Sequence, residues 1–144
     1  MSALLDVNVL IASAWPNHVH HASARAWFED RQDDGWATCP LTEAGFVRVS
    51  CNPSVVRHSV TVLDAIAVLD RLTRLGNHEF WPLEQSIVNL PEPLGTRVQG
   101  YRQVTDAVLL GVAMHRDGQL ATFDGGIARL VSEGERAYVC VVPV

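Results

Sequence analysis

Lysine is absent from this sequence of 144 residues, and all 11 basic residues are arginines. Without lysine the chain has no side-chain amine for Schiff-base catalysis, no lysine for a Walker-type phosphate loop and no kinase-type lysine. Positive charge is also scarce, because 16 acidic residues give a formal net charge of −5. This balance argues against a broad basic surface for nucleic acid on a monomer.

Cysteine is rare and irregularly placed, at positions 39, 51 and 140 only. Three distant cysteines fit neither a disulfide framework nor a zinc pattern, so we expect buried thiols in a reducing compartment, the cytoplasm. No apolar run is long enough to span a bilayer, and we expect no membrane association. The first basic residue is Arg25, so the apolar start lacks the positive region of a signal peptide.

Apolar residues make up 48% of the chain and charged residues 19%, which is enough for a full core. The length predicts one domain over residues 1–144. Strands are expected at 3–6, 36–39, 79–81, 119–123 and 137–142, and helices at 10–14, 20–31, 40–51, 62–75, 104–115 and 126–131, with a loop at 89–100. In the helix at 62–75, positions 62, 65, 66, 69 and 72 form the apolar face. This alternation predicts a three-layer α/β fold with a mainly parallel central sheet flanked by helices.

Four acidic residues follow or face the carboxyl ends of the expected strands. Asp6 and Asp124 come directly after two strands, Glu43 lies in the first turn of a helix, and Asp106 begins the helix that leads into a strand. Ligands of parallel α/β sheets bind at this edge. Clustered carboxylates disfavour one another's ionisation, and oxygen-only ligands suit Mg²⁺ or Mn²⁺. Taken singly, each residue also fits a helix cap or a turn, and that reading stays open.

Four blocks of sequence, in order along the whole chain, resemble the PIN domain and, more narrowly, the VapC-type ribonuclease toxins of bacterial type II toxin–antitoxin pairs. The blocks are Leu4-Leu5-Asp6-Val7-Asn8-Val9-Leu10-Ile11, Thr42-Glu43, Thr105-Asp106-Ala107 and Ala121-Thr122-Phe123-Asp124. The resemblance implies a PIN-like fold, a Mg²⁺-dependent endoribonuclease (Mn²⁺ being a substitute), an RNA substrate, a homodimer and an inhibiting antitoxin.

By the same resemblance, Asp6, Asp106 and Asp124 are expected metal ligands, the first two being primary. Glu43 and Asp124 would complete the catalytic acidic pocket, directly or through water. Asn8 would orient Asp6, and Thr122 would support the fourth acidic position.

The sequence departs from the family pattern at two places. Val7 stands where a small hydroxyl residue is common, which puts one supporting hydrogen bond in doubt. Gly125 and Gly126 follow the last aspartate, which puts a fifth carboxylate and a firmly held second metal in doubt.

The same residues argue against two other functions. A signalling receiver domain needs a lysine, and a haloacid dehalogenase-type phosphatase needs an aspartate at position 8, where Asn8 stands. A PIN-fold RNA-processing nuclease outside a toxin pair and a non-catalytic PIN-like binding module both remain open.

Two further sets of residues have less specific patterns. His18, His20 and His21 are expected at the surface or as a helix cap, since no partner pair completes a metal pattern. Arg48, Arg97, Arg102 and Arg129 are candidates for RNA contact because they lie near the acidic blocks in sequence.

Overall fold

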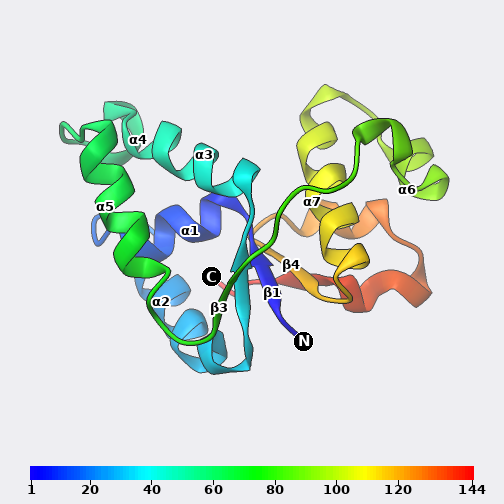
Figure 1. Ribbon diagram of the computed structural model, residues 1–144, viewed down its shortest axis with the longest axis horizontal. Helices are drawn as coiled ribbons and strands as arrows, with labels where there is room; N and C mark the ends of the chain where they lie inside the picture. The colour runs from blue at the N-terminus through cyan, green and yellow to red at the C-terminus, as the bar shows by residue number, and fades with distance from the viewer.

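The computed structural model describes residues 1–144 and has a five-stranded sheet in its centre (Figure 1). The strands are β1 (Ala3–Leu5), β2 (Trp36–Thr38), β3 (His78–Phe80), β4 (Gln119–Thr122) and β5 (Val139–Val141). Their order is β3-β2-β1-β4-β5, and every neighbouring pair is parallel. The predicted α/β fold with a parallel sheet is therefore confirmed.

Helices cover both faces of this sheet and make the three expected layers. Figure 1 places α1 (Val7–Ala14), α2 (His21–Arg31), α3 (Pro40–Ser50), α4 (Pro53–Val56) and α5 (Val62–Leu72) on one side, and α6 (Glu92–Arg97) and α7 (Val104–His115) on the other. Short 3₁₀ helices complete the chain: η1 (Gln32–Asp34), η2 (Ile87–Asn89), η3 (Tyr101–Gln103), η4 (Gly125–Leu130) and η5 (Glu133–Tyr138). None of the helices combines the length and apolarity needed to cross a membrane.

Side-chain alternation along β1 divides the core into two parts. Ala3 and Leu5 pack with Phe28 and Trp36 under the helices of the first side, whereas Leu4 packs with residues such as Leu110 on the second side. Successive side chains of a strand point to opposite faces, so a three-residue strand that is buried on both faces must be apolar throughout.

Several predicted elements differ from the structure. The helix expected to reach residue 75 ends at Leu72, and its outer positions Val62 and Ile66 are 55% and 47% exposed, because only Ala65, Leu69 and Leu72 face the core. The expected loop at 89–100 contains α6, which begins with a proline in its first turn and buries Leu94.

The C-terminal part is also less regular than predicted. The expected helix at 126–131 is the 3₁₀ helix η4. The expected last strand shortens to Val139–Val141 because η5 occupies the residues before it.

Candidate active site

Asp6 connects the end of β1 to the start of α1. It is the N-cap of α1, where its Oδ1 accepts a hydrogen bond from the Val7 amide at 2.8 Å. Its backbone amide donates to the carbonyl of Ala121 at 2.9 Å, which fixes the junction to β4. Burial raises the pKa of Asp6, and the negative charge of Asp124 raises it further, whereas hydrogen bonds from Val7 and Thr122 lower it. The residue is therefore a helix cap and also part of an acidic group.

Thr122 is the buried last residue of β4 and links two of the acidic residues. Its hydroxyl donates to Oδ2 of Asp6 at 3.1 Å and accepts from the amide of Asp124 at 3.0 Å. The Oδ1 atom of Asp124 accepts from the Gly126 amide at 2.8 Å, as the N-cap of η4. The other oxygen of Asp124 has no hydrogen-bond partner within the chain, so it is free to bind a ligand.

Asp106 lies in the first turn of α7 and is half-buried. Burial and the negative charges of Asp6 and Asp124 raise its pKa to about 6. Three aspartates from β1, α7 and β4 thus act on one another electrostatically, although their sequence positions are up to 118 residues apart. We call Asp6, Asp106 and Asp124 the aspartate group.

Glu43 lies in the first turn of α3. This helix passes close to α1, the helix that Asp6 caps: a Cβ atom on Gly45 would lie 2.5 Å from Cγ2 of Val7, so only glycine fits without a shift. The side chain of Glu43 is hydrogen-bonded, because Thr38 at the end of β2 donates to its Oε1 at 2.7 Å.

Other predicted residues have varied surroundings. Asn8 is exposed and makes no side-chain hydrogen bond, so Thr122, not Asn8, binds the carboxylate of Asp6 in this structure. Nδ1 of His18 accepts from the amide of His20 at 3.0 Å, before α2 begins, and His20, the N-cap residue of α2, makes no side-chain capping hydrogen bond. Arg97 forms an ion pair with Glu135 at 2.9 Å, whereas Arg48, Arg102 and Arg129 form none.

Sequence reasoning did not identify Thr38 or His78, which both lie near Glu43. Thr38 precedes Glu43 by only five residues and lies near the end of the expected strand at 36–39, and these two features together were a usable signal. His78 carries no such signal, because only the pairing of β2 with β3 brings it to this position.

The chemistry of these residues fits a hard divalent cation held by few protein ligands. All donors are carboxylate oxygens, and the raised pKa of Asp106 indicates negative charge that a cation would neutralise. The side chains do not form a complete cage, since no group of three or more His, Cys, Asp or Glu residues is arranged around one point. Mg²⁺, which keeps several waters, suits such an open arrangement.

Comparison with known proteins gives one consistent result. Residues 3–132 match the family model described as the PIN domain. The chain is 50% identical over 137 residues to Ribonuclease VapC38 of Mycobacterium tuberculosis, with 95% of each chain covered. It is 48% identical to Ribonuclease VapC39 (93% of this chain, 96% of that one) and 44% identical to Ribonuclease VapC44 (89% of each), both from the same species.

Proposed function

This chain belongs to the PIN-domain family of VapC-type proteins, and we propose that it is a metal-dependent endoribonuclease that acts in the cytoplasm as the toxin of a type II toxin–antitoxin pair. The observation that carries the proposal is the aspartate group: half-buried Asp106 lies near Asp6 and Asp124 at the carboxyl edge of the sheet, and its pKa is raised to about 6. The names of the relatives, all ribonucleases, agree with it.

In the proposed mechanism, Asp6 and Asp106 would hold the cation, Asp124 would bind it directly or through water, and Glu43 would complete the acidic pocket. A bound Mg²⁺ or Mn²⁺ would supply Lewis-acid chemistry and lower the pKa of the water that attacks an RNA phosphodiester. Thr122 fixes Oδ2 of Asp6, and the Val7 amide fixes Oδ1, so this carboxylate keeps one orientation. One carboxylate of the pocket would take the proton of the attacking water as its oxygen bonds to phosphorus, while the P–O bond to the departing sugar oxygen breaks and that oxygen takes a proton from solvent.

RNA binding requires positive charge that a chain with net charge −5 supplies only locally. Arg48, Arg102 and Arg129 carry guanidinium groups without carboxylate partners and are the candidates for phosphate contact. We propose a homodimer, in which arginines of two subunits line one RNA groove.

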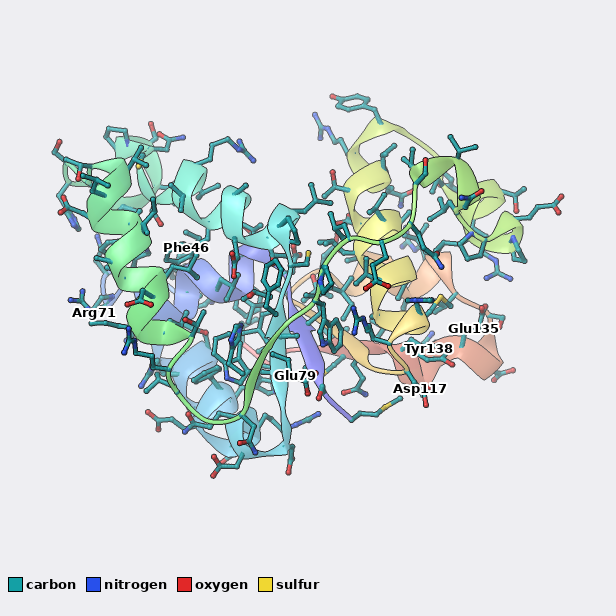
Figure 2. The ribbon with its side chains drawn as sticks, viewed as in Figure 1. Phe46, Arg71, Glu79, Asp117, Glu135 and Tyr138 are labelled. Atoms are coloured by element: carbon teal, nitrogen blue, oxygen red, sulfur yellow. The ribbon has the colours of Figure 1, made fainter.

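An antitoxin is the second proposed partner, and an open cleft of about 400 Å³ between α1, α2 and α5 fits it. Trp15, Val68, Leu72 and Leu75 give the cleft apolar walls for a partner helix. Arg71, labelled in Figure 2 on α5, lies at the cleft and forms no ion pair. Ser13 lines the same cleft, and its Oγ atom is buried without a hydrogen-bond partner.

The test uses the purified chain, freed of partner, with a total RNA mixture as substrate. We expect cleavage with Mg²⁺ or Mn²⁺, loss of cleavage with EDTA and recovery when the metal is restored. Growth arrest on expression, relieved by a copurifying small protein, identifies a toxin. Cleavage without growth arrest supports an RNA-processing nuclease, and RNA binding without cleavage supports a non-catalytic module.

A further inference from the structure

Glu43 ends a chain of hydrogen bonds that crosses two strands of the sheet. Its Oε1 accepts from the Thr38 hydroxyl at 2.7 Å, and Oγ1 of Thr38 lies 2.9 Å from Nε2 of His78. Thr38 is fully buried, so no water competes for its hydroxyl. The other oxygen of Glu43, Oε2, has no hydrogen-bond partner within the chain.

The donor and acceptor of each of these hydrogen bonds follow from the number of protons available. A threonine hydroxyl has one proton, and here it is donated to the carboxylate of Glu43. Oγ1 of Thr38 must therefore accept from His78, which requires a proton on Nε2 of the imidazole. The sequence of donors is His78 Nε2–H to Thr38 Oγ1–H to Glu43 Oε1.

His78 is held in place from a second direction. Its ring lies against Trp36 with centroids 4.6 Å apart and planes inclined by 57°. Trp36 is itself buried and donates from Nε1 to the carbonyl of Leu75 at 2.8 Å. The register that pairs Trp36 with His78 puts Trp36, Thr38 and the imidazole on one face of the sheet.

We propose that His78 is a positioning residue for Glu43, acting through Thr38 and without contact with substrate. With Oε1 fixed by Thr38, the carboxylate presents Oε2 to the acidic pocket in one orientation, toward water or the cation. The edge strand β3 thereby sets the geometry of a site built at the ends of β1 and β4. This inference rests on the proposed nuclease function.

Two pairs of variants test the proposal. His78→Gln keeps an N–H donor near the place of Nε2, and His78→Leu removes it; Thr38→Ser keeps the hydroxyl, and Thr38→Val removes it. We expect His78→Leu and Thr38→Val to lower kcat about tenfold with little change in KM, and the two conservative variants to retain most of the activity. A merely structural role would give equal losses in His78→Gln and His78→Leu.

A spectroscopic readout needs no activity. Long-range ¹H–¹⁵N correlation spectra of the metal-free wild type should show neutral His78 protonated at Nε2, and Thr38→Val should shift its ring signals. A proton on Nδ1, or full activity of His78→Leu, would overturn the proposal. If His78→Leu does not fold, the activity of Thr38→Val and the tautomer of His78 in the wild type test the proposal instead. If the wild type proves inactive, the nuclease function fails while the tautomer still tests the hydrogen-bond chain.

Discussion

Asp6 and Asp106 of the aspartate group have raised pKa values, whereas the pKa of another carboxylate of the same chain, Glu135, is lowered. Burial and the charges of Asp6 and Asp124 raise the pKa of Asp106 to about 6. Hydrogen bonds from Ser132, followed by the Arg97 guanidinium, lower the pKa of Glu135 to about 2. Glu135, labelled in Figure 2, lies in the segment before β5, away from the strand ends that carry the aspartate group.

This difference separates a functional arrangement from a stabilising one. Ser132 donates its amide to Glu135 at 2.9 Å, and Arg97 donates to the same oxygen at 2.9 Å, so charge on Glu135 favours the folded state. Asp106 has no such donors, and its charge opposes folding until a cation arrives. Repulsion of this kind is retained where a ligand relieves it, which makes the aspartate group the place to look for function.

The largest expected effect is on catalysis. Asp106→Asn replaces a charged oxygen by a neutral amide of the same shape, and we expect RNA cleavage to fall at least roughly tenfold, as for a lost metal ligand. Initial rates of cleavage in Mg²⁺ measure the loss. Asp117→Asn is the matched control, because it removes one negative charge from an exposed turn outside the site and asparagine tolerates its positive φ of 53°. Equal rates for wild type and Asp106→Asn would remove Asp106 from the site.

The place of the aspartate group in the fold could largely be predicted from the sequence. Short apolar strands that end in Asp6 and Asp124 predicted the edge where the acidic residues meet, because parallel strands place their carboxyl ends together. The orientation of the Glu43 side chain could not be predicted from the sequence, because it depends on a hydrogen bond from Thr38 and on the pairing of β2 with β3.

Two differences along the chain depend on tertiary packing. A segment rich in proline and glycine suggested a loop at 89–100, but burial of Leu94 against α7 stabilises α6 there, so packing outweighs local propensity. The apolar face predicted for the 62–75 helix is wider than the part of α5 that the core covers, since Val62 and Ile66 remain exposed.

Metal binding should produce the largest change in stability. A cation that binds the folded aspartate group but not the unfolded chain stabilises the protein by about 2.7 kcal/mol at a concentration one hundred times its Kd. We expect Mg²⁺ to raise the Tm of the wild type more than that of Asp6→Asn or Asp106→Asn. Scanning calorimetry with Mg²⁺ and with EDTA measures this difference. The same shift in all three proteins would place the cation elsewhere.

A smaller effect is expected in the metal-free protein. The folded state holds the Asp106 proton up to about pH 6, whereas the unfolded chain releases it near pH 3.8, so the free energy of unfolding falls as pH rises between these values. The penalty persists at neutral pH. Because the side chain is half-exposed and screened by solvent, we expect Asp106→Asn or Asp6→Asn to gain about 1 kcal/mol at pH 7 in EDTA.

Urea unfolding at pH 7 and at pH 3.5 measures this gain, which should become small at the lower pH, where the Asp106 carboxyl is protonated in the folded state and mostly protonated in the unfolded chain. Asp117→Asn again serves as the control and should show no gain of this size. If metal-free Asp6→Asn is less stable than the wild type at pH 7, its hydrogen bonds as the cap of α1 outweigh the repulsion, and the capping role dominates at that residue.

The smallest expected effect concerns Glu135, where removing the charge should lower the free energy of unfolding. Because the pKa of Glu135 is lowered to about 2, its stabilisation is complete above the ordinary value of 4.5 and is lost as pH falls through about 2. Glu135→Gln should lose roughly 0.5 kcal/mol at pH 7, since the ion pair with Arg97 is about one-third exposed on both sides. Urea unfolding at pH 7 should separate it from wild type, and the curves should converge near pH 2. Glu133→Gln, an exposed neighbour without an ion-pair partner, should match wild type at both pH values. A stability gain in Glu135→Gln at neutral pH would contradict the contrast between the two carboxylates, because its charge would then oppose folding as that of Asp106 does.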